Sequence, residues 1–271
     1  MSLRARPGIL GLVTAVLLVL EWSVPAEAGT VAIISRFTIT RDGQPFFDDT
    51  FTGPYASLAT PRMAGGQPTQ YVVVGSIPDG SAVNGKLSLN SANGTPSATA
   101  DGRTRQTTGA RLMTNNDPQN ATAGLKSGFT FSMSGLFDLV VPGGPVEGYG
   151  IRFGDFDPSR KAAHVISLFV FRNESNALVV RFLHQDFDKG RQYVVEEPSI
   201  DPTMGDQVLL TLTRASLKSN EVTAQYQFLR KGAPANKPLA LSTAAPVFGG
   251  GPRKWTRGEF FVFEQVTSLG R

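Results

Sequence analysis

Apolar and polar residues alternate along many short segments of this chain. The clearest case is the segment 207–229, QVLLTLTRASLKSNEVTAQYQFL. Apolar residues stand at every second position from Val208 to Leu212 in its first half and from Val222 to Phe228 in its second half. Successive side chains of a β-strand point to opposite faces of the sheet, so this spacing gives one apolar and one polar face. The pattern predicts an antiparallel hairpin of two half-buried strands.

Short β-branched and aromatic runs recur along the rest of the chain and are separated by turn residues, a pattern typical of an all-β sandwich or barrel. A second hairpin is expected to turn at the polar tetrapeptide 173–176, NESN. The segments 90–108 and 231–251 are rich in turn residues, and we expect long surface loops there. Strands are expected over 31–40, 71–77, 85–90, 110–114, 128–134, 137–141, 149–153, 166–172, 177–184, 192–195, 207–214, 222–229 and 259–265.

The first 28 residues have the layout of a secretory signal peptide. Arg4 and Arg6 are followed by a short apolar run over 9–20, and then by the small-x-small sequence Ala26-Glu27-Ala28. The apolar run is too short to cross a bilayer core of about 30 Å. We therefore expect an exported chain, periplasmic or extracellular, with a single β-sandwich domain over residues 29–271 and no membrane span after cleavage.

Composition narrows the function classes further. The chain has no cysteine, which excludes disulfides, thiol catalysis and cysteine-based metal sites. The formal net charge is +4, and removing residues 1–28 does not change it, because that segment holds two basic and two acidic residues. This mild charge is compatible with a polyanionic partner but is not a nucleic-acid signature, so no nucleic acid is expected.

Several motifs occur in an order that resembles the concanavalin A-like (laminin G-like, lectin/glucanase) jelly rolls. The motifs are FFDDTF, GKLSLN, SGFTFSMSGLFDL, GYGIRFGD, ISLFVFRN, DQVLLTLTR and EFFVFEQV, and the resemblance covers most of residues 46–266. It implies an antiparallel two-sheet β-sandwich with a curved sheet whose concave face or rim loops bind sugars. The superfold hosts lectins, hydrolases, lyases and adhesion modules, so the resemblance does not fix the function.

A catalytic signature is missing from the sequence. Glycosidases of this fold class place two carboxylates on one strand, two or four positions apart, so that both face the substrate. Glu196 and Glu197 are adjacent and would point to opposite faces, and Glu147 has no acidic residue at either spacing. His164 and His184 are not accompanied by a G-x-S-x-G or H-E-x-x-H motif. These patterns favour a protein without enzymatic activity.

Two D-F-D segments leave a metal site open. HQDFDKG contributes Asp186 and Asp188, and GDFDPSR contributes Asp155 and Asp157. Calcium binds six to eight oxygens, and D-x-D-x-G can supply the first of them, but further ligands are not evident nearby. The simpler interpretation is turn chemistry, with Gly190 in the left-handed region of a hairpin loop. Calcium is the one cofactor that the sequence leaves open.

Sugar recognition needs exposed aromatic rings together with side chains that hydrogen-bond to hydroxyl groups. Tyr149 follows a Gly/Pro-rich loop, and Trp255 lies in the basic segment PRKWTRG, which suits an acidic glycan or another polyanion. Arg152, Asn173 and Arg181 lie on strands or at a hairpin turn and are candidates for a solvent-facing sheet surface. Each also has a structural interpretation, because Trp255 can close one end of a sandwich and polar sheet faces need no ligand.

These observations predict an exported β-sandwich binding module for a carbohydrate or another extracellular polymer. One alternative is a structural or adhesion protein without a small-ligand site. The other is a glycan-degrading enzyme with a noncanonical site, in which His184 and the aspartates of the two D-F-D segments would converge in one groove.

Overall fold

The structure is a computed structural model that describes residues 31–52, 58, 60–64, 67–78, 81–98, 103–113, 129–154, 164–186, 189–216, 221–246 and 259–267. The predicted signal peptide, and with it four of the candidate site residues, lie outside this described part: Asp155, Asp157, Asp188 and Trp255. Its helices are two short 3-10 turns, η1 (Ser91–Asn93) and η2 (Pro202–Met204). Within the described ranges, no helix is long and apolar enough to cross a membrane.

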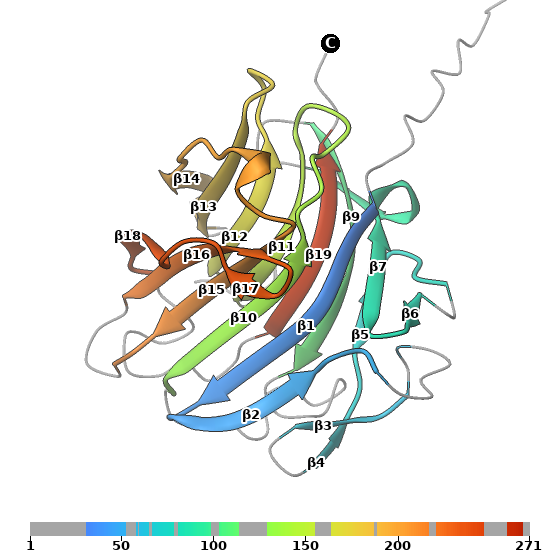
Figure 1. Ribbon diagram of the computed structural model, residues 1–271. Coiled ribbons are helices and arrows are strands. Elements are labelled where there is room, and N and C mark those ends of the chain that lie inside the picture. The colour runs from blue at the N-terminus through green and yellow to red at the C-terminus, as the bar shows by residue number, and fades with distance from the viewer. Residues whose placement is uncertain are drawn as a thin grey trace, which may run out of the picture.

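Two antiparallel sheets pack face to face as a β-sandwich, as predicted, and this arrangement is compatible with a jelly roll (Figure 1). Sheet A has 11 strands, with the main order β17 (Ala233–Pro234), β16 (Val222–Arg230), β15 (Gln207–Arg214), β10 (Phe131–Asp138), β1 (Val31–Arg41), β2 (Gln44–Asp49), β3 (Arg62–Ala64) and β4 (Gln67–Thr69). Three further strands join it at its sides, namely β18 (Leu239–Ala244) on β16, β7 (Lys86–Asn90) on β1, and β6 (Ala82–Val83) on β7.

Sheet B has 8 strands and carries the candidate site. Its main order is β14 (Arg191–Glu196), β13 (Leu178–Asp186), β12 (His164–Arg172), β11 (Glu147–Gly154), β19 (Glu259–Thr267), β9 (Thr104–Met113) and β5 (Val72–Val74), with β8 (Thr95–Ala98) on β9. Figure 1 shows the two layers, one running from β16 through β10 to β2 and the other from β14 through β11 to β9.

Both predicted hairpins, one from alternation and one from its turn residues, are confirmed. Strands β15 and β16 pair antiparallel with Val208 opposite Phe228, so their apolar positions share the buried face. Strands β12 and β13 form the second hairpin, whose turn is closed by a hydrogen bond from the Asn176 backbone N–H to the Asn173 carbonyl. Asn176 has a φ of 65°, a left-handed conformation that asparagine tolerates better than most residues.

Three predictions about strand limits are wrong. Residues 95–98 form β8 and β9 begins at Thr104, both within the segment 90–108 where a loop was expected, whereas the strand expected over 110–114 is the second half of β9. Strand β18 forms within the second expected loop. Their turn-like composition is outweighed by pairing, because β9 lies between β19 and β5 and β18 pairs with β16. Strand β10 is continuous through Gly135, where two strands were expected, since the side chains of Phe137 and Ile151 fill the space beside this glycine.

The main hydrophobic core lies between the sheets and is rich in aromatic rings. Phe131 of sheet A packs against Phe153 and Phe260 of sheet B, with ring centroids 4.4 and 5.6 Å apart. Sheet B is covered on its other side as well, because every position of β12 from His164 to Phe171 is buried. A second apolar cluster therefore lies on the outer face of sheet B, and it includes the outward-pointing rings of β12 and β19.

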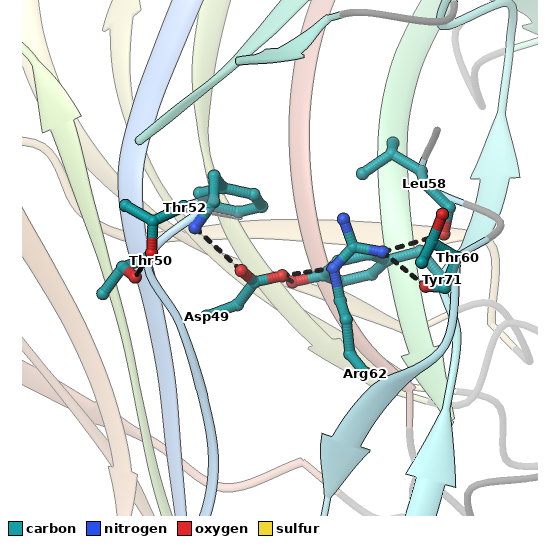
Figure 2. A network of polar contacts seen from close by, with 8 residues as sticks. Asp49, Thr50, Thr52, Leu58, Thr60, Arg62 and Tyr71 are labelled. Atoms are coloured by element: carbon teal, nitrogen blue, oxygen red, sulfur yellow. Dashed lines mark hydrogen bonds and ion pairs between the residues drawn. The ribbon is translucent and has the colours of Figure 1, made fainter. Parts of the chain in front are cut away.

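A buried ion pair anchors one end of sheet A (Figure 2). The Arg62 Nε donates to Asp49 Oδ2 at 2.5 Å, and its Nη1 donates to the carbonyl groups of Leu58 and Thr60 at 3.1 and 2.8 Å. The Tyr71 hydroxyl donates to the same carboxylate oxygen at 3.2 Å, and the guanidinium lies 4.9 Å from the centre of the Tyr71 ring. This buried arginine thus has a carboxylate of its own, which makes it a structural group.

Candidate functional site

Four phenylalanine rings cover the outer face of sheet B. Phe169 and Phe171 of β12 and Phe261 and Phe263 of β19 alternate along their strands with residues of the main core, so they point away from it. Three of them have glycines of β11 as cross-strand neighbours: Gly148 pairs with Phe171, and Gly150 pairs with Phe169 on one side and Phe263 on the other. A glycine leaves the space above its strand to the rings of neighbouring strands.

Arg152 lies among these rings on the same face of β11. Its guanidinium is 4.1 Å from the centre of the Phe263 ring, its Nε donates to Ser167 Oγ at 2.9 Å, and its Nη2 donates to Gln265 Oε1 at 2.9 Å. The side chain is only 6% exposed, and both hydrogen-bond partners are neutral. Burial, and next the positive charge of Arg105, lower the pKa of Arg152 to about 9. In the part of the chain that the structure describes, no carboxylate pairs with Arg152.

Further arginines surround Arg152. We use the name arginine face for the outer surface of sheet B that carries the four phenylalanines together with Arg103, Arg105, Arg152 and Arg181. The Arg181 guanidinium is 4.0 Å from the centre of the Phe171 ring and pairs with Glu197. Arg103 pairs with Glu174. The predicted residues Arg152 and Arg181 thus lie on one surface.

A pocket of about 180 Å³ opens in the arginine face. Its walls include the positively charged Arg103, Arg105 and Arg181, against a single acidic residue, Glu174. Two glutamines and two of the phenylalanines complete the main lining: Gln192, Gln265, Phe169 and Phe171. A cavity of about 150 Å³ accommodates one benzene ring, so this pocket matches a single six-membered ring more closely than a larger ligand.

Two of the predicted binding residues have other roles. The Asn173 side chain accepts from the Ala177 backbone N–H at 2.9 Å and donates to Glu197 at 3.0 Å, so it holds the β12–β13 turn and the partner of Arg181.

Tyr149 was expected beside a loop at the surface, and this prediction is wrong, because the residue is 0% exposed. It shares the core side of β11 with Ile151 and Phe153, and its hydroxyl donates to the Val140 carbonyl at 2.9 Å. Burial raises the pKa of the Tyr149 hydroxyl.

Sequence reasoning missed most of the pocket. Arg103 and Arg105 fell in a segment expected to be a loop, although their spacing of two is that of one strand face. Phe169 and Phe171 belong to a continuous apolar run, which does not show which positions face outward. Gln265 gives no signal of its own, because its role depends on the neighbouring Arg152.

The D-F-D segment 186–188 is described only at Asp186. Asp186 Oδ1 accepts from the Lys189 backbone N–H at 3.2 Å, and Gly190 has a φ of 57°, so the left-handed glycine expected in the β13–β14 hairpin is confirmed. The same Asp186 oxygen is 3.8 Å from Nε2 of His164. Among the residues whose placement is described, no group of three or more histidines and carboxylates is arranged to hold a metal ion.

A pair of carboxyl groups does occur inside the sandwich, where the sequence spacing gave no sign of one. Glu147 of β11 and Glu264 of β19 lie on neighbouring strands, on the core side, because Glu264 pairs across the strands with Tyr149. The two side chains are 2% and 0% exposed. Burial, with a further contribution from Glu147, raises the pKa of Glu264 to about 9, although Ser91 acts in the opposite sense. Their burial keeps these acids out of reach of a polymer substrate.

Comparison of the chain with models of known protein families, with curated proteins and with solved structures finds no match. Function is therefore inferred from the geometry of sheet B.

Proposed function

We propose that this protein is an exported β-sandwich of the concanavalin A-like type that binds a carbohydrate or another extracellular polymer on its arginine face. The observation that carries the proposal is the pocket of about 180 Å³, which combines phenylalanine rings with several side-chain hydrogen-bond donors. The signal-peptide layout of residues 1–28 supports export, and the two-sheet sandwich supports the family assignment.

The chemistry of the lining suits a sugar ring. Phe169 and Phe171 form the buried apolar floor beneath the arginines, and the amides of Gln192 and Gln265 give polar groups directed by neighbouring side chains. Ligand sites of this kind are mostly apolar, with a few placed polar groups that set orientation. The volume fits one ring of a polymer, so the remaining units lie outside the pocket.

The floor of the pocket is held rigidly, which favours binding. The Phe169 and Phe171 rings are 1% and 2% exposed and pack against each other with centroids 5.3 Å apart. The ion pair between Arg181 and Glu197 fixes one wall, and Asn173 holds Glu197 from the other side. A preorganised site loses less conformational entropy when a ligand binds.

The proposal is tested by measuring the thermal unfolding midpoint of the purified protein with a panel of soluble polysaccharides. A ligand that binds only the folded state stabilises it by about 2.7 kcal/mol at a hundredfold excess over its dissociation constant. We expect at least one polysaccharide to raise the midpoint, and Phe171→Ala to reduce the shift. Leu239→Ala, at an exposed position of sheet A, serves as the matched control. If the shift is the same in Phe171→Ala and in the unaltered protein, the arginine face is not the binding surface.

A further inference from the structure

Resting on that function, we infer that the pocket of the arginine face selects an anionic sugar, one whose ring carries a carboxylate or a sulfate group, over a neutral sugar of the same shape. The inference depends on the charges around the pocket, on the missing partner of Arg152, and on the direction in which Gln265 donates.

The first observation is a buried cation, Arg152, beside which the described residues place no carboxylate. Arg62, another buried arginine of this protein, has the Asp49 carboxylate at 2.5 Å. Arg152 is similarly buried, yet its described partners are the hydroxyl of Ser167 and the amide of Gln265. A buried charge without an opposite charge is unfavourable, and an anion bound nearby would offset that cost.

The second observation is the balance of charge on the arginine face. Among the described residues of the pocket lining, three are arginines and one is an acid, Glu174, which pairs with Arg103, while Arg181 pairs with Glu197 beside the pocket. After burial, the like charge of Arg105 also lowers the pKa of Arg152. Positive charge is thus in excess around the pocket, and a walled site of one sign favours a ligand of the opposite sign.

The third observation is the orientation of Gln265, which connects Arg152 to the pocket. Arginine has only donors, so the Gln265 atom that receives its hydrogen bond at 2.9 Å is the carbonyl oxygen. The amide NH₂ of Gln265, which lines the pocket, is left to donate. Gln192 also accepts with its oxygen, from Gln185 Nε2 at 3.3 Å. A lining dominated by donors matches the acceptor oxygens of a carboxylate or a sulfate.

The test compares polymers that differ only in charge. Polygalacturonate and its fully methyl-esterified form share the same ring, and dextran sulfate and dextran form a second pair. Binding is measured by calorimetry at about 0.15 M salt, where charges more than ~8 Å apart are largely screened. We expect at least one acidic polymer to bind about tenfold or more tightly than its neutral counterpart, which is the effect of a single charge-assisted hydrogen bond. Which acid binds distinguishes carboxylate from sulfate.

Two variants locate the effect. Arg105→Gln should weaken binding of the acidic polymer about tenfold more than binding of the neutral polymer, so that the ratio of the two affinities falls. Gln265→Glu would place a carboxylate beside Arg152, so it should abolish the preference for the acidic polymer and raise the unfolding midpoint. Arg36→Gln, at an exposed arginine of sheet A, removes the same charge elsewhere and should have no effect.

Equal binding of acidic and neutral polymers would overturn this inference and leave the proposed function standing. Binding of none of the four polymers, together with no midpoint shift across the polysaccharide panel, would overturn both. An Arg36→Gln variant that weakens binding as much as Arg105→Gln would also overturn the inference, because binding would then reflect net charge and not this pocket.

Discussion

His164 and His184, the chain's two histidines, lie against each other, with His164 Nδ1 2.8 Å from His184 Nε2. The rings are stacked with centroids 5.1 Å apart, and Asp186 is 3.8 Å from the other nitrogen of His164. In this contact one nitrogen donates and the other accepts, so at least one ring is neutral. Burial, and next His164, lower the pKa of His184 to about 4, against a smaller opposing effect of Asp186.

This lowered pKa predicts a loss of stability in mild acid. The unfolded chain takes up a proton on His184 near pH 6.5, whereas the folded protein resists protonation until about pH 4. The unfolded state therefore binds more protons between these values, and the free energy of unfolding falls as the pH is lowered through this window. His184 is partly exposed, so we expect an effect on the order of 1–2 kcal/mol after solvent screening.

The measurement is urea denaturation from pH 7 to 4, with His184→Gln as the comparison. The variant should lose less stability over this range than the unaltered protein, because glutamine does not titrate. Equal losses in the two proteins would show that acid instability comes from carboxylates elsewhere.

The raised pKa of Glu264 predicts that the free energy of unfolding changes with pH in the opposite direction. Its pKa is raised to about 9 in the folded protein, while the unfolded chain loses this proton near pH 4.5. Between these values the folded state holds the extra proton, so stability falls as the pH rises. Glu264→Gln keeps the size of the side chain and removes the titration. We expect the variant to be more stable than the unaltered protein at pH 8, by up to several kcal/mol, and similar to it near pH 4.

The unaltered protein, measured by urea denaturation over the same pH range, is the reference for this comparison. A Glu264→Gln variant that is less stable at every pH would instead indicate an ionised carboxylate with a favourable partner in the folded protein.

The sequence predicted those parts of the fold in which the residues of a single strand show a periodic apolar pattern. The hairpin of β15 and β16 was recognisable because apolar positions repeat with period two within each strand. The site was not recognisable, because it depends on which strands become neighbours. Arg152 meets Gln265 only through the pairing of β11 with β19. Local spacing could show neither that contact nor the meeting of Glu147 and Glu264.

Tyr149 illustrates a second limit. The sequence placed it correctly on a strand, but the glycines beside it removed the apolar alternation that shows which side faces the core. The Tyr149 side chain points to the core face of β11 and is 0% exposed between the sheets. It therefore packs in the core and does not meet a ligand.

The ion pair between Asp49 and Arg62 predicts a large cost when only one partner is removed (Figure 2). Arg62→Met leaves the Asp49 carboxylate buried beside Tyr71, and we expect a loss of about 3–5 kcal/mol in the free energy of unfolding. The exposed pair of Arg36 and Asp48, at 52% and 49% exposure, is the control, and Arg36→Met should cost about 0–1 kcal/mol. Urea denaturation at pH 7 measures both. Equal losses in the two variants would mean that burial does not determine the strength of the Arg62 pair.

The close packing around Gly150 indicates that the floor of the pocket forms only when β11 and β12 lie close together. A Cβ atom at this position would lie 2.2 Å from the Leu168 carbonyl oxygen and 2.5 Å from Cα and Cβ of Phe169. Real Cβ atoms do not approach other atoms so closely, so Gly150→Ala must push the strands apart. We expect a loss of about 1–3 kcal/mol in stability, and weaker polysaccharide binding because Phe169 lines the pocket.

The matched control is Gly190→Ala in the β13–β14 turn. This glycine has a φ of 57° and open space around it, so alanine there meets only the backbone penalty of about 1–2 kcal/mol. Its binding should be unchanged, whereas Gly150→Ala should lose both stability and binding. Shortening the ring with Phe169→Leu should not rescue Gly150→Ala, because the closest atoms belong to the backbone and to Cβ. Recovery of stability in the double variant would show that the ring itself, and not the strand spacing, is what alanine displaces.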